Sequence, residues 1–134
     1  QAVLPGMLAR RTGAVVHVAS VAAFMTSPGN ATYSATKAFL VMLATGMSTE
    51  LAGTGVQVQA LCPGFTRTEF HARARMDARE IPGALWMDAG SVVDASLAAL
   101  RRGGPVVVVP GARYRAVVAA VRHVPLRLLT WLLA

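Results

Sequence analysis

Three short apolar runs alternate with segments of helical spacing, and this alternation constrains the fold of the 134-residue chain more than any other feature. The runs are residues 14–19, 56–62 and 106–109, each rich in valine or alanine and bounded by glycine, proline or polar residues. The run at residues 106–109 is continuous and apolar, as expected for a strand of a parallel sheet that is buried on both faces. We therefore predict an α/β fold, a doubly wound parallel sheet with right-handed crossovers.

The segments around these runs predict helices over residues 1–11, 32–51, 88–103 and 112–134, the last with a break at Pro125. Glycine follows the first three, as is usual just after the end of a helix. In the long helix, apolar residues at helical spacing define a stripe that consists of Ala35, Ala38, Phe39, Met42 and Leu43.

The composition indicates part of a larger protein in a reducing compartment. Apolar residues make up 54% of the chain and charged residues 14%, which is little charge to cover a small self-contained domain. The single cysteine, Cys62, excludes an intrachain disulfide and fits a cytoplasmic location. We recognise no secretory signal and no apolar run long enough to span a membrane.

The net charge of +7 does not by itself indicate nucleic-acid binding. The arginines are scattered over helix ends and turns, with no interleaved aromatic platform, so solvated faces explain them and we expect no nucleic-acid partner. The basic amphipathic tail, residues 112–134, leaves alternatives open. It can lie on an anionic membrane surface, as a peripheral contact, or pack against its own sheet or a partner subunit.

Three residues suited to proton transfer are predicted to meet at one sheet edge. Ser20 ends the first strand, while Tyr33 and Lys37 lie four residues apart on one face of the helix that follows. Lys37 is the only lysine, beside twelve arginines. A free phenol has a pKa near ~10, and a neighbouring cation stabilises the phenolate. Such a phenol can exchange a proton with a carbinol oxygen.

Ser20 followed thirteen residues later by Tyr33-x-x-x-Lys37 resembles the catalytic residues of the short-chain dehydrogenase/reductase family. A second motif, Pro63-Gly64-x-x-x-Thr68, follows the next predicted strand. The resemblance covers nearly the whole chain. It implies a Rossmann-like fold of which residues 1–134 are the carboxyl-terminal half, with the glycine-rich cofactor half missing.

The resemblance implies an NAD(P)(H)-dependent oxidoreductase that interconverts an alcohol with a ketone or aldehyde. Tyr33 would be the general acid/base, Lys37 its pKa perturber and ribose anchor, and Ser20 the donor that orients the substrate. The cofactor-binding turn would consist of Pro63, Gly64, Thr66 and Thr68, which hold the nicotinamide carboxamide. The family often has asparagine where this chain has Cys62, for which a nucleophilic role is not indicated.

The family also implies a substrate lid over residues 69–87, with Pro82-Gly83 as its hinge. Apolar residues in and near it predict a small hydrophobic carbonyl or alcohol substrate. The residues expected to contact the substrate are Phe24, Met25, Phe65, Phe70 and Trp86, although packing in the core remains an alternative for them. His17 reads as a satisfied core histidine, and no residue spacing supports a metal site.

The family further implies a homo-oligomer, a dimer or tetramer, that packs through the helix at residues 32–51. Small residues at Ala35, Ala38 and Gly46 would permit close approach there. We expect the isolated fragment to be inactive. The alternative function is a truncated non-catalytic scaffold that binds a partner or a membrane surface.

Overall fold

The computed structural model describes residues 2–69, 81–125 and 128 of the chain. Its elements, with η marking a turn of 3₁₀ helix, are α1 (Leu4–Ala9), β1 (Gly13–Val18), η1 (Val21–Ala23), α2 (Ala31–Glu50), β2 (Val56–Leu61), η3 (Gly83–Leu85), α4 (Ala89–Arg101), β3 (Val107–Val108) and α5 (Ala112–His123). The predicted strands and helices within the described residues are present, with ends shifted by a few residues.

The three strands form one parallel sheet in the order β1-β2-β3, which confirms the predicted parallel α/β arrangement. β1 pairs with β2 over its whole length. β3 contributes two residues, Val107 and Val108, fewer than the predicted run 106–109. Pro105 and Pro110 flank this run, and a proline has no amide hydrogen to donate to a neighbouring strand.

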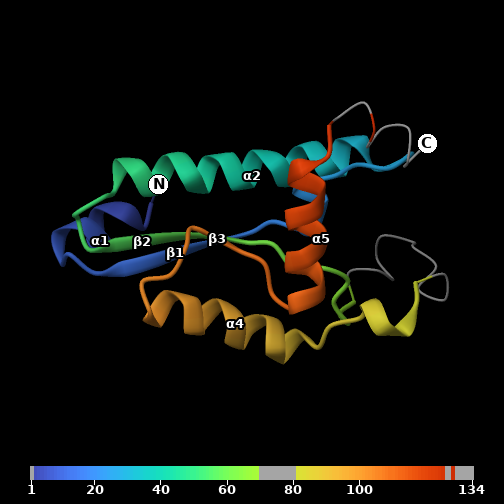
Figure 1. The fold of residues 1–134 in the computed structure, drawn as a ribbon. Helices are drawn as coiled ribbons and strands as arrows, with labels where there is room; N and C mark the ends of the chain where they lie inside the picture. The colour runs from blue at the N-terminus through green and yellow to red at the C-terminus, as the bar shows by residue number, and fades with distance from the viewer. Residues whose placement is uncertain (1, 70–80, 126–127, 129–134) are drawn as a thin grey trace.

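Helices cover both faces of the sheet, α2 on one side and α4 on the other (Figure 1). On the α2 side the buried cluster consists of Ala19, Ala44, Val58, Ala60 and Cys62. On the α4 side it consists of Leu61, Val92, Ala99 and Val108. Successive residues of β2 thus enter different clusters, as expected for a strand covered on both faces.

The apolar stripe on the long helix lies on its exposed side. Phe39 is 63% exposed and Met42 is 72% exposed, whereas Ala44 is fully buried. The inward face of α2 instead carries Leu40 and Val41 against the sheet cluster. Because α2 is apolar on both sides, its spacing alone could not show which side meets the sheet.

A buried polar pair fastens α4 to β2. Gln59 and Ser96 are both almost fully buried. The Gln59 Nε2 atom donates to the Ser96 carbonyl at 3.2 Å. The Ser96 hydroxyl in turn donates to Gln59 Oε1. The side chains of Gln59 and Ser96 therefore partner each other, which avoids the cost of burying them unsatisfied.

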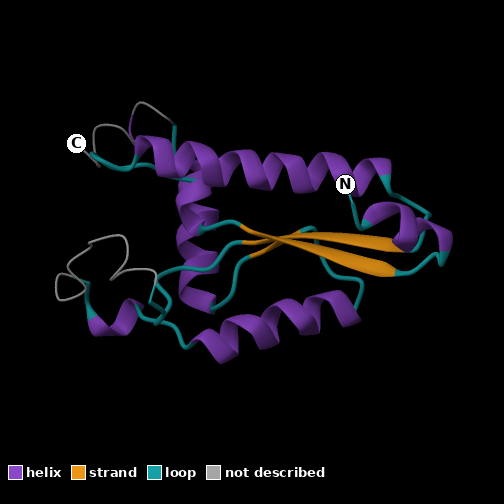
Figure 2. Ribbon diagram, turned by 180° about the vertical axis from the view of Figure 1, so that it is seen from behind, coloured by secondary structure: helices purple, strands orange, loops and turns teal. Residues whose placement is uncertain are grey.

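α5 lies across the carboxyl ends of the strands, between the layers formed by α2 and α4 (Figures 1 and 2). It ends at His123, before Pro125. Of the predicted basic tail beyond Pro125, the structure describes Leu128 alone. In the described part of the chain, no helix has the length and apolar character needed to cross a membrane.

Candidate active site

Ser20 lies just past the end of β1 and caps the short helix η1. Its Oγ atom accepts a hydrogen bond from the Ala22 amide at 3.1 Å. The amide of Val21, the residue after Ser20, donates to the Pro63 carbonyl at 3.0 Å. This hydrogen bond ties the turn at Ser20 to the turn after β2. Because Ser20 acts as an acceptor in its cap, its hydroxyl hydrogen can be donated to a substrate oxygen.

Tyr33 and Lys37 lie in the first two turns of α2, and both are half-buried. The Lys37 Nζ atom donates to the Val18 carbonyl at 3.0 Å, at the carboxyl end of β1. The same Nζ lies 5.6 Å from the centre of the Tyr33 ring. Lys37 therefore links the phenol on α2 to the strand end that leads into Ser20.

Cys62 lies at the same junction, and its side chain is fully buried. Burial raises the pKa of its thiol to about 11, against the opposing effects of a backbone hydrogen bond from Ser20 and the charge of Lys37. A thiol held in its neutral form is a poor nucleophile. The sequence did not reveal that Lys37 is close to Cys62, yet burial outweighs this proximity.

The turn after β2 is braced by side chains and by backbone pairing. The Thr66 hydroxyl donates to the Gly64 carbonyl at 3.0 Å. The Met87 amide donates to the Phe65 carbonyl at 2.7 Å, and the Arg67 amide donates to the Met87 carbonyl at 3.0 Å. The predicted cofactor turn thus pairs with Met87, the last residue of the predicted lid.

Most of the predicted lid cannot be placed, because residues 70–80, Phe70 among them, lie outside the described residues. At its far end, the rings of Phe65 and Trp86 have centroids 6.0 Å apart. The Arg67 guanidinium lies 5.4 Å from the centre of the Trp86 ring. Two of the residues predicted to contact the substrate therefore lie together beside the turn.

The other two substrate candidates follow Ser20. Phe24 packs against the core cluster on the α2 side, and the Arg122 guanidinium lies 5.5 Å from the centre of its ring. Met25 is half-buried. Phe24 thus takes part in the core, and it also anchors the far end of α5.

His17 is not the satisfied core histidine that we predicted. Its Nε2 atom is buried and has no hydrogen-bond partner among the described residues. Its neighbours on β1 are valines, and the residue paired with it in the register is Ala60, so no polar group is supplied by the strand itself.

Sequence reasoning missed two residues of α5 that contact this region, Tyr114 and Arg122. Tyr114 is 9% exposed, and its hydroxyl contacts the backbone of both Phe65 and Leu85. Arg122 lies over Phe24. Contacts across 29 or more residues leave no local pattern, although Tyr114 is the only tyrosine besides Tyr33.

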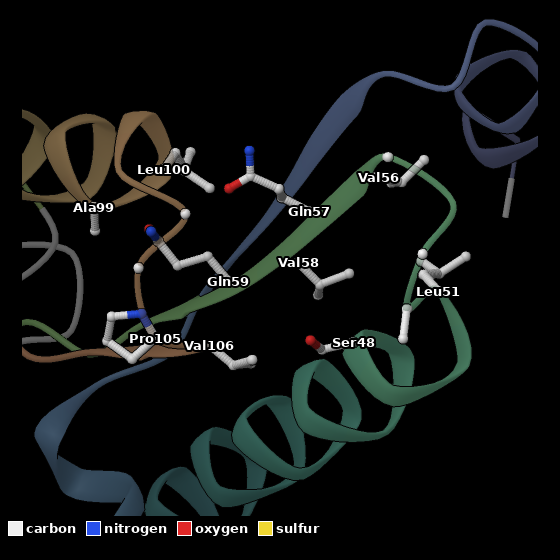
Figure 3. Close-up of a pocket in the computed structure, with 15 residues that line it drawn as sticks. Ser48, Leu51, Val56, Gln57, Val58, Gln59, Ala99, Leu100, Pro105 and Val106 are labelled. Atoms are coloured by element: carbon white, nitrogen blue, oxygen red, sulfur yellow. The ribbon is translucent and has the colours of Figure 1, made fainter.

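A hollow of about 440 Å³ lies elsewhere, at the amino end of β2 (Figure 3). Its lining includes Ser48, Val56, Gln57 and Pro105, and none of the predicted catalytic residues. Because the ligands of open parallel sheets bind at the carboxyl ends of the strands, this hollow is not the candidate active site. No group of histidine, cysteine and acidic side chains suited to a metal ion occurs in the described ranges.

Known proteins share the sequence and the fold of this chain. The sequence profile described as short chain dehydrogenase matches residues 1–79. Oxidoreductase UcpA of Escherichia coli (strain K12) is 44% identical over 69 residues, which are 51% of this chain and 26% of UcpA.

Two solved structures share the fold. A short-chain dehydrogenase from Sphingobium yanoikuyae in complex with NADPH has a TM-score of 0.74 and 37% identity, over 90% of this chain and 48% of that one. A short chain dehydrogenase from Burkholderia cenocepacia J2315 in complex with NADP has a TM-score of 0.79 and 29% identity, over 98% of this chain and 51% of that one.

The parallel sheet with helices on both faces, and the polar residues at its carboxyl edge, define a Rossmann-like α/β protein. The family profile covers more than half of the residues, and the chain belongs to the short-chain dehydrogenase family. It spans about half the length of the two solved relatives.

Proposed function

We propose that the protein is an NAD(P)(H)-dependent oxidoreductase that interconverts an alcohol and a ketone or aldehyde. The observation that carries this proposal is the hydrogen bond from Lys37 Nζ to the Val18 carbonyl at 3.0 Å. It links the lysine, with Tyr33 one turn away, to the strand end that leads into Ser20. Family membership supports the same chemistry.

In this proposal Tyr33 is the general acid and base. During reduction the carbonyl oxygen takes the proton of the Tyr33 hydroxyl, and during oxidation the alcohol returns a proton to the phenolate. Lys37 uses one of its three donors on Val18, which leaves two for a cofactor ribose. Its positive charge stabilises the phenolate form, and Ser20 orients the substrate oxygen.

The turn that follows β2 fits the nicotinamide end of an NAD(P) cofactor. The turn is hydrogen-bonded to the Ser20 region, because the Pro63 carbonyl accepts from the Val21 amide. We assign the carboxamide contacts to the Thr66 backbone and the Thr68 hydroxyl. The bound cofactor supplies or accepts the hydride at the substrate carbon.

We propose that the chain corresponds to the carboxyl-terminal half of the family fold. Both motifs of the resemblance lie within residues 20–68. The sequence contains no glycine-rich pyrophosphate turn, and the chain covers about half of each solved relative. In this view the pyrophosphate and adenosine contacts come from the other half, so tests require the gene's full-length product.

The substrate we propose is a small hydrophobic ketone or the corresponding alcohol. The support is the pair of aromatic rings, Phe65 and Trp86, beside the cofactor turn. Aromatic side chains with few polar groups favour apolar ligands in such sites.

The test follows NAD(P)H absorbance in the full-length product with a panel of hydrophobic ketones. We expect turnover by the wild type and a loss of at least about 100-fold in kcat for Lys37→Met, the usual scale for a lost acid–base contribution. Thr45→Val is the control, because its hydroxyl bonds the Val41 carbonyl farther along the same helix. It should retain activity. No turnover with any ketone would favour the non-catalytic scaffold instead.

A further inference from the structure

We propose that Tyr114 is a positioning residue for the cofactor, which holds the turn after β2 against the end of the predicted lid. This inference rests on the proposed function and extends it to a residue of α5. Tyr114 itself is assigned no contact with cofactor or substrate. It acts through the backbone of Phe65 and Leu85.

The Tyr114 hydroxyl joins two segments through the two roles a hydroxyl has. Its Oη atom accepts a hydrogen bond from the Phe65 amide at 3.1 Å. It donates one to the Leu85 carbonyl at 2.6 Å. Phe65 lies in the turn assigned to the nicotinamide, and Leu85 ends η3 at the far side of the predicted lid. One oxygen therefore sets the separation of these segments.

The Tyr114 ring also lies directly against the turn. A side-chain carbon added at Gly64 would lie 2.0 Å from the Tyr114 Cζ atom, far inside van der Waals contact. The absence of a side chain at Gly64 is what lets the ring pack there. The glycine of the Pro-Gly motif thus serves this packing.

Arg113, the residue before Tyr114, also bonds η3. Arg113 Nη1 donates to the Ala84 carbonyl at 2.6 Å. The first turn of α5 therefore bonds two successive carbonyls of η3, while Met87 pairs with the backbone of Phe65 and Arg67. The turn after β2, the η3 segment and the first turn of α5 therefore meet here. Tyr114, on α5, bonds to the other two.

The position of Thr66 depends on this arrangement. Thr66 follows Phe65, and its hydroxyl bonds the Gly64 carbonyl, so its backbone moves with the two residues that Tyr114 contacts. If the Tyr114 hydroxyl is lost, the Phe65 amide and the Leu85 carbonyl lose a partner. The turn then samples more positions. The affinity for the cofactor should fall, whereas the rate of the chemical step should change little.

The experiment compares Tyr114→Phe with the wild type in the full-length product. It measures the Kd of NADPH and NADH by fluorescence, and KM and kcat for the coenzyme. Tyr114→Phe keeps the ring and removes the hydroxyl. Ser96→Ala is the matched control, because it removes a buried hydroxyl whose partner is Gln59, on the α4 side of the sheet. All measurements are made well below the melting temperature of the variants.

We expect Tyr114→Phe to raise the coenzyme Kd and KM about five-fold, the scale of one typical hydrogen bond, with little change in kcat. Ser96→Ala should lower the melting temperature and leave the Kd unchanged. An unchanged Kd in Tyr114→Phe, or an equal rise in Ser96→Ala, would overturn the positioning role while the proposed function stands. A wild type that binds neither coenzyme would overturn the proposed function, and this role with it.

Discussion

At the scale of single residues, the junction of β1, β2 and α2 combines groups with different tasks. Lys37 donates one hydrogen bond to the Val18 carbonyl. Cys62, beside it in space, is fully buried. Burial raises the pKa of the Cys62 thiol to about 11 although the Lys37 charge opposes this. The environment therefore keeps the thiol neutral.

The raised pKa of Cys62 predicts a pH dependence of stability. The folded state holds the thiol proton more tightly than the unfolded state, whose thiol has its ordinary pKa of 9.0. This contribution is complete below pH 9 and is lost as the pH rises from 9 to about 11. The loss should be on the order of 2 kcal/mol. Urea unfolding of wild type and Cys62→Ala between pH 8 and 11 measures it.

The comparison removes the effect of other groups that titrate in the same range. Tyrosines and the remaining residues are identical in the two proteins. As the pH rises, the free energy of unfolding should therefore fall more in the wild type than in Cys62→Ala. Parallel stability curves would show that the thiol proton does not contribute.

At the scale of elements, α2 has two apolar faces. Leu40, Val41 and Ala44 pack on the sheet, whereas Phe39 and Met42 are largely exposed. The small residues Ala35, Ala38 and Gly46 lie on the exposed side. Exposed apolar side chains next to small ones are typical of an interface, and we propose that this face of α2 packs against a second copy of the protein.

A charge placed on this face should weaken association. We expect Met42→Glu to shift the full-length protein to a smaller assembly, because a carboxylate would be buried without a partner. Sedimentation velocity measures the shift. Ala52→Glu, at an exposed position just past the same helix, carries the same charge and should leave the assembly intact. A monomeric wild type, or equal behaviour of the two variants, would contradict the prediction.

The elements also show what sequence reasoning could recover. Glycine, proline and polar caps placed the ends of β1, α2, β2 and α4 to within a few residues. The same reasoning did not show which face of α2 meets the sheet, because an apolar residue at helical spacing is equally suited to the sheet and to a partner. It also overestimated β3, where Pro105 and Pro110 restrict pairing to two residues.

At the scale of the whole molecule, α5 closes the carboxyl end of the sheet (Figure 2). Its first turn bonds η3 through Arg113 and Tyr114, and Tyr114 also bonds the turn after β2. Its last turn places Arg122 over Phe24, just after Ser20. α5 thus contacts the segments that follow both β1 and β2. The sequence predicted a helix here but left its partners open, because these contacts are long-range.

The proposed catalytic residues follow from a local motif, whereas the residues that support them do not. Ser20, Tyr33 and Lys37 follow a motif within eighteen residues of sequence, so a single helix and one turn relate them. Tyr114 and Phe65 are 49 residues apart, and only the folded chain brings them together. Their relation depends on how α5 crosses the sheet.

The most direct measurement of the central claim compares Tyr33→Phe with the wild type in the gene's full-length product. A ketone that the wild type reduces serves as substrate, and NAD(P)H consumption and coenzyme Kd are measured for both proteins. We predict that kcat falls by at least about 100-fold while the coenzyme Kd changes little, because the phenylalanine ring cannot exchange a proton. A variant that reduces the ketone as fast as the wild type would contradict the role of Tyr33 as the acid and base.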